Sequence, residues 1–242
     1  MKAAARRLAP NVVLEYWQRR AFDAEQARDR GRPLQDVFHE IYEKKVWARE
    51  ATDVRYTSGP GSAPEVSRNY EDFMVGLIER RPEVRTLVDI GCGDFQVSGR
   101  ILARLTRPMC YVGCDIAANV VAFNQERHGR EGVVFRTLDA SSAMPPAGDL
   151  VMVREVFQHL SNATILQTIG RLRTVFQEAV ITESLVVPCA APNVDLVSGY
   201  RTRDGLKSGV FVDLAPFNLL VIEEMITPFS DHEQFRTTLV KL

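Results

Sequence analysis

The amino-acid sequence predicts an α/β fold: a seven-stranded, mostly parallel sheet with an N-terminal helical cap and a C-terminal antiparallel hairpin. Short apolar, β-branched runs alternate with helical stretches at lengths suited to right-handed parallel crossovers. Three successive runs each finish in an aspartate. The last two runs, 219–226 and 235–241, are separated only by residues 227–233 and are expected to pair as the hairpin.

The composition is that of a soluble globular protein built on one α/β domain. The chain has 242 residues, of which 45% are hydrophobic and 25% charged, so it can bury a substantial core. We expect a helical cap and flap over residues 1–62 and the sheet domain over residues 63–242. The net charge of −1 gives no electrostatic case for binding nucleic acid, which needs a basic face.

The expected absence of targeting signals and the pattern of cysteines predict a cytoplasmic protein. Residues 1–20 lack the apolar segment of a signal peptide, and no run approaches the ~20 apolar residues of a membrane span. Cys92, Cys110, Cys114 and Cys189 match no zinc-binding spacing, and we expect them to be reduced thiols.

The N-terminal cap is predicted to hold two helices. Apolar and aromatic residues recur at helical spacing over 12–20 and again over 37–45, with Gly31 to Pro33 between them. The first helix either anchors to the core through its aromatic side chains or serves self-association. A homodimer is therefore among the expected assemblies.

Residues 57–64 form a turn-rich segment of glycine, proline and serine between the cap and the sheet. Ser62 and Glu65 have the spacing of a capping box, with Pro64 in the first turn, and predict a helix from Ala63 to Arg80. The segment is either a plain linker with its cap or a glycine-rich flap over the open side of a ligand site.

The fold is organised around Leu87–Phe95. A buried strand leads through Asp89, and Gly91 and Gly93 then alternate with small residues, so the backbone can pass close to a ligand. The next run, 109–114, ends in Asp115, whose carboxylate can accept hydrogen bonds from both hydroxyls of a ribose. These features predict a nucleotide site at the ends of the strands.

A third run, 133–138, ends in Asp139, and Gln96 stands where a dinucleotide-binding fingerprint requires its third glycine. The sequence therefore argues against NAD. The combined pattern, from residue 69 to 187, resembles the class I methyltransferases that depend on S-adenosylmethionine (SAM). The resemblance implies a Rossmann-like sheet and SAM as the cofactor.

The resemblance also implies the cofactor contacts. The glycine loop would pass the amino-acid and ribose end of SAM, Asp115 would take the ribose hydroxyls, and Asp139 would accept from the adenine amine. Asp89 would bind the amino group or brace the loop, while each aspartate could instead cap a helix. The predicted cofactor-binding residues are Asp89, Gly91, Gly93, Asp115, Ile116, Asp139, Ala140 and Arg154.

A fourth strand, 149–153, leads into Arg154–Asn162, which in this family lies beside the sulfonium and the acceptor. His159 is the candidate base, because an imidazole is mostly neutral at pH 7; the alternative is that it packs the start of the next helix, 163–176. Glu155 and Gln158 stand where some family members bind a metal. No metal is expected, because hard cations want several oxygen ligands and Gln158 is neutral.

A fifth strand over 180–187 precedes an irregular segment, 188–217, of the kind that is functional or disordered in compact domains. Arg154 and the charged residues from Arg201 to Lys207 could hold an anionic group, but a solvated loop face is favoured for the latter. Tyr42–Trp47 and residues 58–62 resemble bacterial methyltransferases of glycan and small-molecule pathways. The predicted substrate-binding residues are Trp47, Gln158, Tyr200 and Arg201.

The sequence thus predicts SAM-dependent methyl transfer to a small-molecule or sugar acceptor, in the first instance at oxygen. Two alternatives stay open. One is N-methylation of a small amine or a protein side chain, and the other is a SAM-binding regulatory protein without catalysis.

Overall fold

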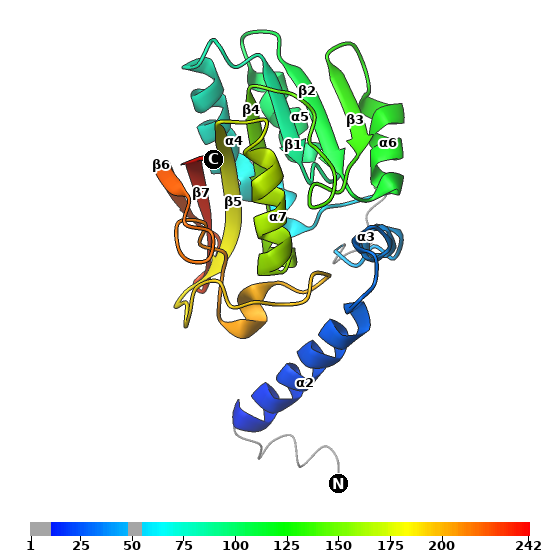
Figure 1. Cartoon of the computed structure of the whole chain (residues 1–242), viewed down its shortest axis with the longest axis vertical. Helices are drawn as coiled ribbons and strands as arrows, with labels where there is room; N and C mark the ends of the chain where they lie inside the picture. The colour runs from blue at the N-terminus through cyan, green and yellow to red at the C-terminus, as the bar shows by residue number, and fades with distance from the viewer. Residues whose placement is uncertain (1–10, 48–54) are drawn as a thin grey trace.

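A single seven-stranded sheet forms the centre of the computed structural model, which describes residues 11–47 and 55–242 (Figure 1). For residues 11–16 and 18 it describes the backbone alone. The strand order is β3-β2-β1-β4-β5-β7-β6. The strands are β1 (Thr86–Ile90), β2 (Cys110–Asp115), β3 (Val133–Thr137), β4 (Leu150–Arg154), β5 (Glu178–Val186), β6 (Leu220–Pro228) and β7 (Glu233–Lys241).

The pairing of the strands confirms the predicted fold class. Strands β1 to β5 pair in parallel, and β7 pairs antiparallel with both β5 and β6. The central parallel strands β1 and β4 are buried on both faces, and β4 is accordingly an unbroken apolar run from Leu150 to Val153. The C-terminal hairpin closes one edge of the sheet.

The crossover helices cover the two faces of the sheet. They are α5 (Gln96–Arg104), α6 (Ala118–His128) and α7 (Asn162–Leu172), and α4 (Pro64–Glu79) precedes β1. From β1 the chain moves to β2 and β3 through α5 and α6, and from β4 it moves the other way through α7. Connections between parallel strands are right-handed, and the chain moves in opposite directions along the sheet before and after β4. Helix α7 therefore lies on the face opposite α5 and α6 (Figure 1). The order reverses between β1 and β4, where such folds bind ligands.

The N-terminal cap contains the two predicted helices, α2 (Asn11–Asp29) and α3 (Leu34–Glu43). Helix α3 buries Val37, Phe38, Ile41 and Tyr42, whereas α2 projects from the body of the molecule (Figure 1). Trp17 is 60% exposed, and Phe22 is the aromatic residue of α2 that is buried. The alternative in which the Trp17 side chain anchors the first helix to the core is therefore wrong. None of the described helices has the length and apolar character needed to cross a membrane.

Two predicted helix ends and one predicted cap are wrong, although α4 keeps its predicted bounds to within one residue. Helix α3 ends at Glu43, since Lys45 has a φ of 51°. Helix α4 is capped by Ala63 without a side-chain bond, because Ser62 closes a short 3-10 helix, η1 (Pro60–Ser62), and is not at the cap position of the predicted capping box. Helix α7 ends at Leu172, four residues before the predicted end, and the hydroxyl of Ser161 caps its start.

Candidate functional site

A cavity of about 470 Å³ opens at the carboxyl ends of the parallel strands, where the strand order reverses. Helix α3, residues 58–62 of the predicted flap, the loops after β1 to β5 and segment 200–208 all contribute to its walls. Every residue predicted for the site lines this one cavity: Trp47, Asp89, Gly91, Gly93, Asp115, Ile116, Asp139, Ala140, Arg154, Gln158, His159, Tyr200 and Arg201.

The loop after β1 leaves no room for side chains. Gly91 and Gly93 have φ values of 76° and 53°, a left-handed backbone that favours glycine. A Cβ atom at Gly91 would lie 2.2 Å from Cγ2 of Val156, and one at Gly93 would lie 2.2 Å from Oγ of Ser58. The two glycines therefore form a backbone cradle at the cavity floor.

Asp115, at the end of β2, holds this cradle in place. Its Oδ2 accepts the Gly93 N–H at 3.0 Å and its Oδ1 accepts the Ala117 N–H at 2.9 Å. Burial raises the pKa of Asp115, while these N–H bonds act in the opposite direction. The carboxylate keeps further acceptor capacity toward the cavity that it lines.

Asp89 and Asp139 both make internal bonds. Asp89 accepts from the Ser98 hydroxyl at 2.6 Å and the Tyr111 hydroxyl at 2.7 Å, and burial raises its pKa to about 6. Asp139 accepts from the N–H and hydroxyl of Ser141. Asp89 thus connects β1 to α5 and β2, and Asp139 caps a turn. Both predicted roles of Asp89, binding the amino group of SAM and bracing the loop, stay predictions. A direct bond from Asp139 to adenine stays a prediction.

The flap is bound to the rest of the site by paired contacts. The Ser58 N–H donates to Oδ2 of Asp94, and the Asp94 N–H donates back to Oγ of Ser58, both at 2.9 Å. Nη2 of Arg154 donates to the Gly61 carbonyl at 2.7 Å, and its guanidinium lies over the rings of Tyr70 and Phe235. Arg154 therefore supports the flap in this structure, and its role toward the cofactor stays a prediction.

His159 lies in the short 3-10 helix η2 (Phe157–His159) and is buried against the cap. Its ring centroid is 5.4 Å from that of Trp47 and 6.3 Å from that of Phe38. Burial lowers its pKa to about 4, so the imidazole is neutral at pH 7. Nδ1 lies 3.2 Å from the Tyr200 carbonyl, which can only accept, so Nδ1 carries the proton.

Residues 88–177 match a protein family described as a methyltransferase domain. The chain carries a methyltransferase domain. The sequence resemblance and the enzyme class predicted from it are confirmed. No curated protein sequence matches the chain.

Solved structures share the fold at low sequence identity. Magnesium protoporphyrin IX methyltransferase from Synechocystis PCC 6803 with bound SAH is 12% identical with a TM-score of 0.56, covering 86% of this chain and 98% of that one. The N-methyltransferase NodS from Bradyrhizobium japonicum WM9 is 13% identical with a TM-score of 0.53, covering 73% and 97%. A DhpI–SAH complex is 10% identical with a TM-score of 0.50, covering 85% and 94%. These likenesses establish the fold.

Two carboxylates of the methyltransferase domain have roles that sequence reasoning missed. The sequence suggests Glu155 only as a metal ligand, but in the structure its Oε2 accepts a hydrogen bond from the Gln158 side-chain amide at 2.9 Å. Glu183 is buried within β5, and its two oxygens accept the N–H groups of Phe157 and Gln158 at 2.9 and 2.8 Å. A charged residue inside an apolar strand was the available signal for Glu183. Among the described residues, no three His, Cys, Asp or Glu side chains are grouped to hold a metal ion.

The prediction of a solvated loop face over Arg201 to Lys207 is wrong for Arg203. It is 1% exposed, and its guanidinium donates to the carbonyls of Val194, Phe157, Gln158 and Leu160 and to the side-chain oxygen of Asn162. Four backbone carbonyls that strand and helix pairing leaves free need donors, and one planar guanidinium supplies them. Arg203 therefore fixes the segment that carries Gln158 and His159.

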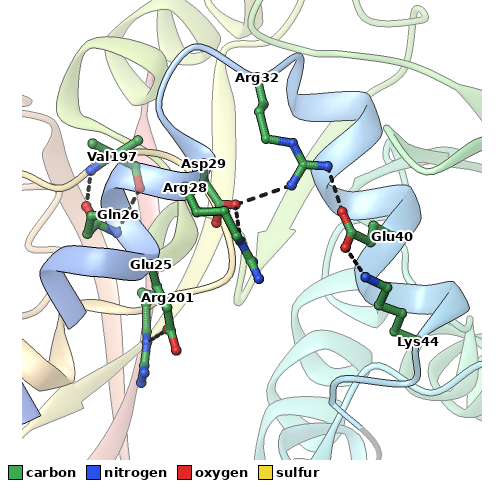
Figure 2. A network of polar contacts seen from close by, with 9 residues as sticks. All are labelled: Glu25, Gln26, Arg28, Asp29, Arg32, Glu40, Lys44, Val197 and Arg201. Atoms are coloured by element: carbon green, nitrogen blue, oxygen red, sulfur yellow. Dashed lines mark hydrogen bonds and ion pairs between the residues drawn. The ribbon is translucent and has the colours of Figure 1, made fainter. Parts of the chain in front are cut away.

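Helix α2 fastens the segment that follows β5 (Figure 2). The side-chain amide of Gln26 bonds both the carbonyl and the N–H of Val197, at 3.2 and 2.5 Å. Glu25 forms an ion pair with Arg201, so the charge of that predicted substrate-binding residue already has a partner. The Gly199 N–H donates in turn to the His159 carbonyl at 2.9 Å. The cap thus contributes to the wall around His159.

Proposed function

We propose that the protein transfers the methyl group of SAM to a hydroxyl oxygen of a small-molecule or sugar acceptor. One observation carries the proposal: a single cavity joins the glycine cradle to buried side chains that can accept a proton. Its volume of about 470 Å³ lies in the range of small-molecule sites. Oxygen is favoured over nitrogen, because a hydroxyl nucleophile needs a base and a neutral amine does not.

SAM is the cofactor of this domain, and the residues present fit it. The glycines have no space for a Cβ atom, which suits a backbone that approaches a ligand closely. Asp115 offers a buried carboxylate for ribose hydroxyls, and Ile116 and Leu138 add an apolar wall. Two of the similar solved structures hold the demethylated product, SAH.

Bound SAM supplies a methyl carbon on a positively charged sulfur, and the transfer is an in-line displacement. The protein's residues then have three tasks: they align the acceptor, exclude water and remove the hydroxyl proton. The residues that would contact the acceptor line this cavity: Trp47, Gln158, Tyr200 and Arg201. His159 as the proton acceptor stays a prediction, and its lowered pKa makes it a weak base.

Other parts of the proposal follow from the sequence. The cap and flap of residues 1–62 would serve the methyltransferase domain of residues 63–242. The acceptor would be a small molecule or sugar, not a nucleic acid, since the net charge is −1. Four free thiols suit the cytoplasm. A homodimer stays a prediction.

Calorimetry with SAM, SAH and NADH tests the cofactor. Binding of both sulfur nucleosides without NADH is expected, and tight NADH binding with no response to either would overturn the proposal. Release of SAH from SAM is then measured with sets of hydroxyl and amine acceptors of matched size. Turnover of amines alone would establish N-methylation, and SAM binding without any turnover would favour a regulatory protein.

A further inference from the structure

The backbone of Glu155 holds an unfavourable conformation at the cavity. Its φ is 59°, in the left-handed region that side-chain-bearing residues rarely adopt. The conformation is held by the Glu155 N–H, which donates to the Thr182 carbonyl of β5 at 2.8 Å. Strained backbone of this kind gathers at functional sites. Glu155 lines the cavity directly after β4.

One carboxylate oxygen of Glu155 has no donor at hydrogen-bond distance among the described residues. Oε2 accepts from Gln158, whereas Oε1 is shielded from water without such a donor, and the Ser184 N–H also favours the ionised carboxylate. The flap lies close by, since a Cβ atom on Gly61 would be 3.9 Å from Oε2. A buried acceptor without a close donor is unfavourable, and a bound donor would relieve this. A hydroxyl group of the acceptor is such a donor.

The charges around Glu155 come from three strands: Glu183 on β5, Arg154 on β4 and Glu233 on β7. Burial raises the pKa of Glu155 to about 7, against the lowering effects of Arg154 and the Gln158 amide. Burial and the charge of Glu155 also raise the pKa of Glu183. The two carboxylates therefore share a proton that the pair retains near neutral pH.

We propose that Glu155 is the catalytic proton acceptor: it gives up its own proton when the positive charge of SAM is bound, and Oε1 then takes the proton of the acceptor hydroxyl. This inference rests on the function proposed above. The hydroxyl oxygen uses an electron pair to form the new O–C bond, while the C–S bond breaks and its pair returns to sulfur. The sulfonium charge is thereby neutralised, and the proton remains on Glu155. Gln158 and Glu183 are positioning residues, because they act through Glu155.

Calorimetry in two buffers of different ionisation enthalpy tests the inference, because it counts the protons released on binding. SAM and SAH differ in the sulfonium charge, so each serves as the reference for the other. The coupled carboxylates Glu155 and Glu183 retain a proton near neutral pH. SAM binding to the intact protein should therefore release more protons than SAH binding.

The Glu155→Gln variant should lose this difference and keep the affinity for SAH within about threefold. Glu223→Gln is the matched control, because Glu223 is an exposed glutamate of β6 paired with Arg80, and it should retain the difference. Equal proton release with SAM and SAH in the intact protein, or a difference that survives Glu155→Gln, would overturn the inference. Failure of the intact protein to bind either nucleoside would instead overturn the proposed function.

A measurement on the intact protein covers the case in which Glu155→Gln does not fold. The ratio of the SAH to the SAM dissociation constant should rise between pH 6 and pH 8, because ionised Glu155 attracts the sulfonium. Each unit by which SAM lowers the pKa of Glu155 corresponds to about tenfold in this ratio. A ratio that does not change with pH would contradict the inference.

Discussion

The cofactor side and the acceptor side of the cavity are built in different ways. On the cofactor side, the groups that fix the loops are near in sequence: Asp89 bonds Ser98, and Asp115 bonds Gly93. On the acceptor side, distant segments meet, and Gln26 bonds a residue 171 positions away. The cofactor side is therefore fixed by successive crossovers of one sheet, whereas the acceptor side depends on how the cap and the late loops pack.

The largest expected effect distinguishes two candidate bases on the acceptor side. Glu155→Gln should lower turnover of a hydroxyl acceptor by ~10²–10⁴-fold, because a neutral amide cannot take the proton. His159→Gln should lower it less than about tenfold, since the imidazole already has a depressed pKa. Initial rates at saturating SAM measure both. A severe loss in folded His159→Gln, with SAM affinity unchanged, would restore His159 as the base.

Removing Arg203 should have the next largest effect, on stability. Arg203→Met leaves several buried carbonyls without a donor, so the free energy of unfolding should fall by about 3–5 kcal/mol. Urea unfolding measures the change, with the exposed Arg173→Met as the control. A loss below about 1 kcal/mol would show that the contacts of Arg203 do not hold the acceptor side together.

A substitution on the cofactor side should act on binding first. Asp115→Ala removes the acceptor of the Gly93 N–H and the expected partner of the ribose, so SAM affinity should fall by about 1.5–3 kcal/mol. Calorimetry measures the affinity, and thermal unfolding checks that the variant is folded. Unchanged affinity in the folded variant would leave Asp115 with its bracing role alone.

The buried glutamates should make stability fall with rising pH. In the unfolded chain Glu155 and Glu183 lose their protons near pH 4.5, whereas in the fold their pKa values are raised to near neutrality. From pH 6.5 to 8 the folded state thus binds more protons than the unfolded state, so stability decreases, by about 1–2 kcal/mol. Urea unfolding at both pH values measures this, and Glu155→Gln should flatten the dependence. An increase of stability over this range would contradict the charge pair.

The smallest expected effect concerns the contact between the cap and the acceptor side. Gln26→Ala removes two hydrogen bonds to Val197, and stability should fall by about 1–2 kcal/mol. Limited proteolysis between residues 197 and 207 should become faster, and SAM with an acceptor should slow it. Asp23→Ala is the control, because Asp23 is paired on the exposed face of α2. Equal cleavage rates in both variants would show that α2 does not fasten this segment.

The sequence was sufficient to predict the sheet and the cofactor side, because their signals are local. Glycine spacing at 91 and 93 and an aspartate at the end of a strand report backbone constraints that neighbouring residues share. Arg203 could not be predicted, since four of its five partners lie more than 40 residues away and its exposed-looking context suggested solvent. The strained backbone of Glu155 likewise has no sequence signature. Long-range packing, rather than residue type, gives these two residues their environment.

The hydrogen bond between His159 and the Tyr200 carbonyl also determines the tautomer of the imidazole. The carbonyl accepts the hydrogen of Nδ1 and so determines which ring nitrogen carries it. The irregular segment that contains Tyr200 is held by Gln26 and Glu25, which lie near the N-terminal end of the sequence. The tautomer of this buried imidazole thus depends on a carbonyl whose segment is held by residues of α2 that lie more than 130 positions away in the sequence from His159.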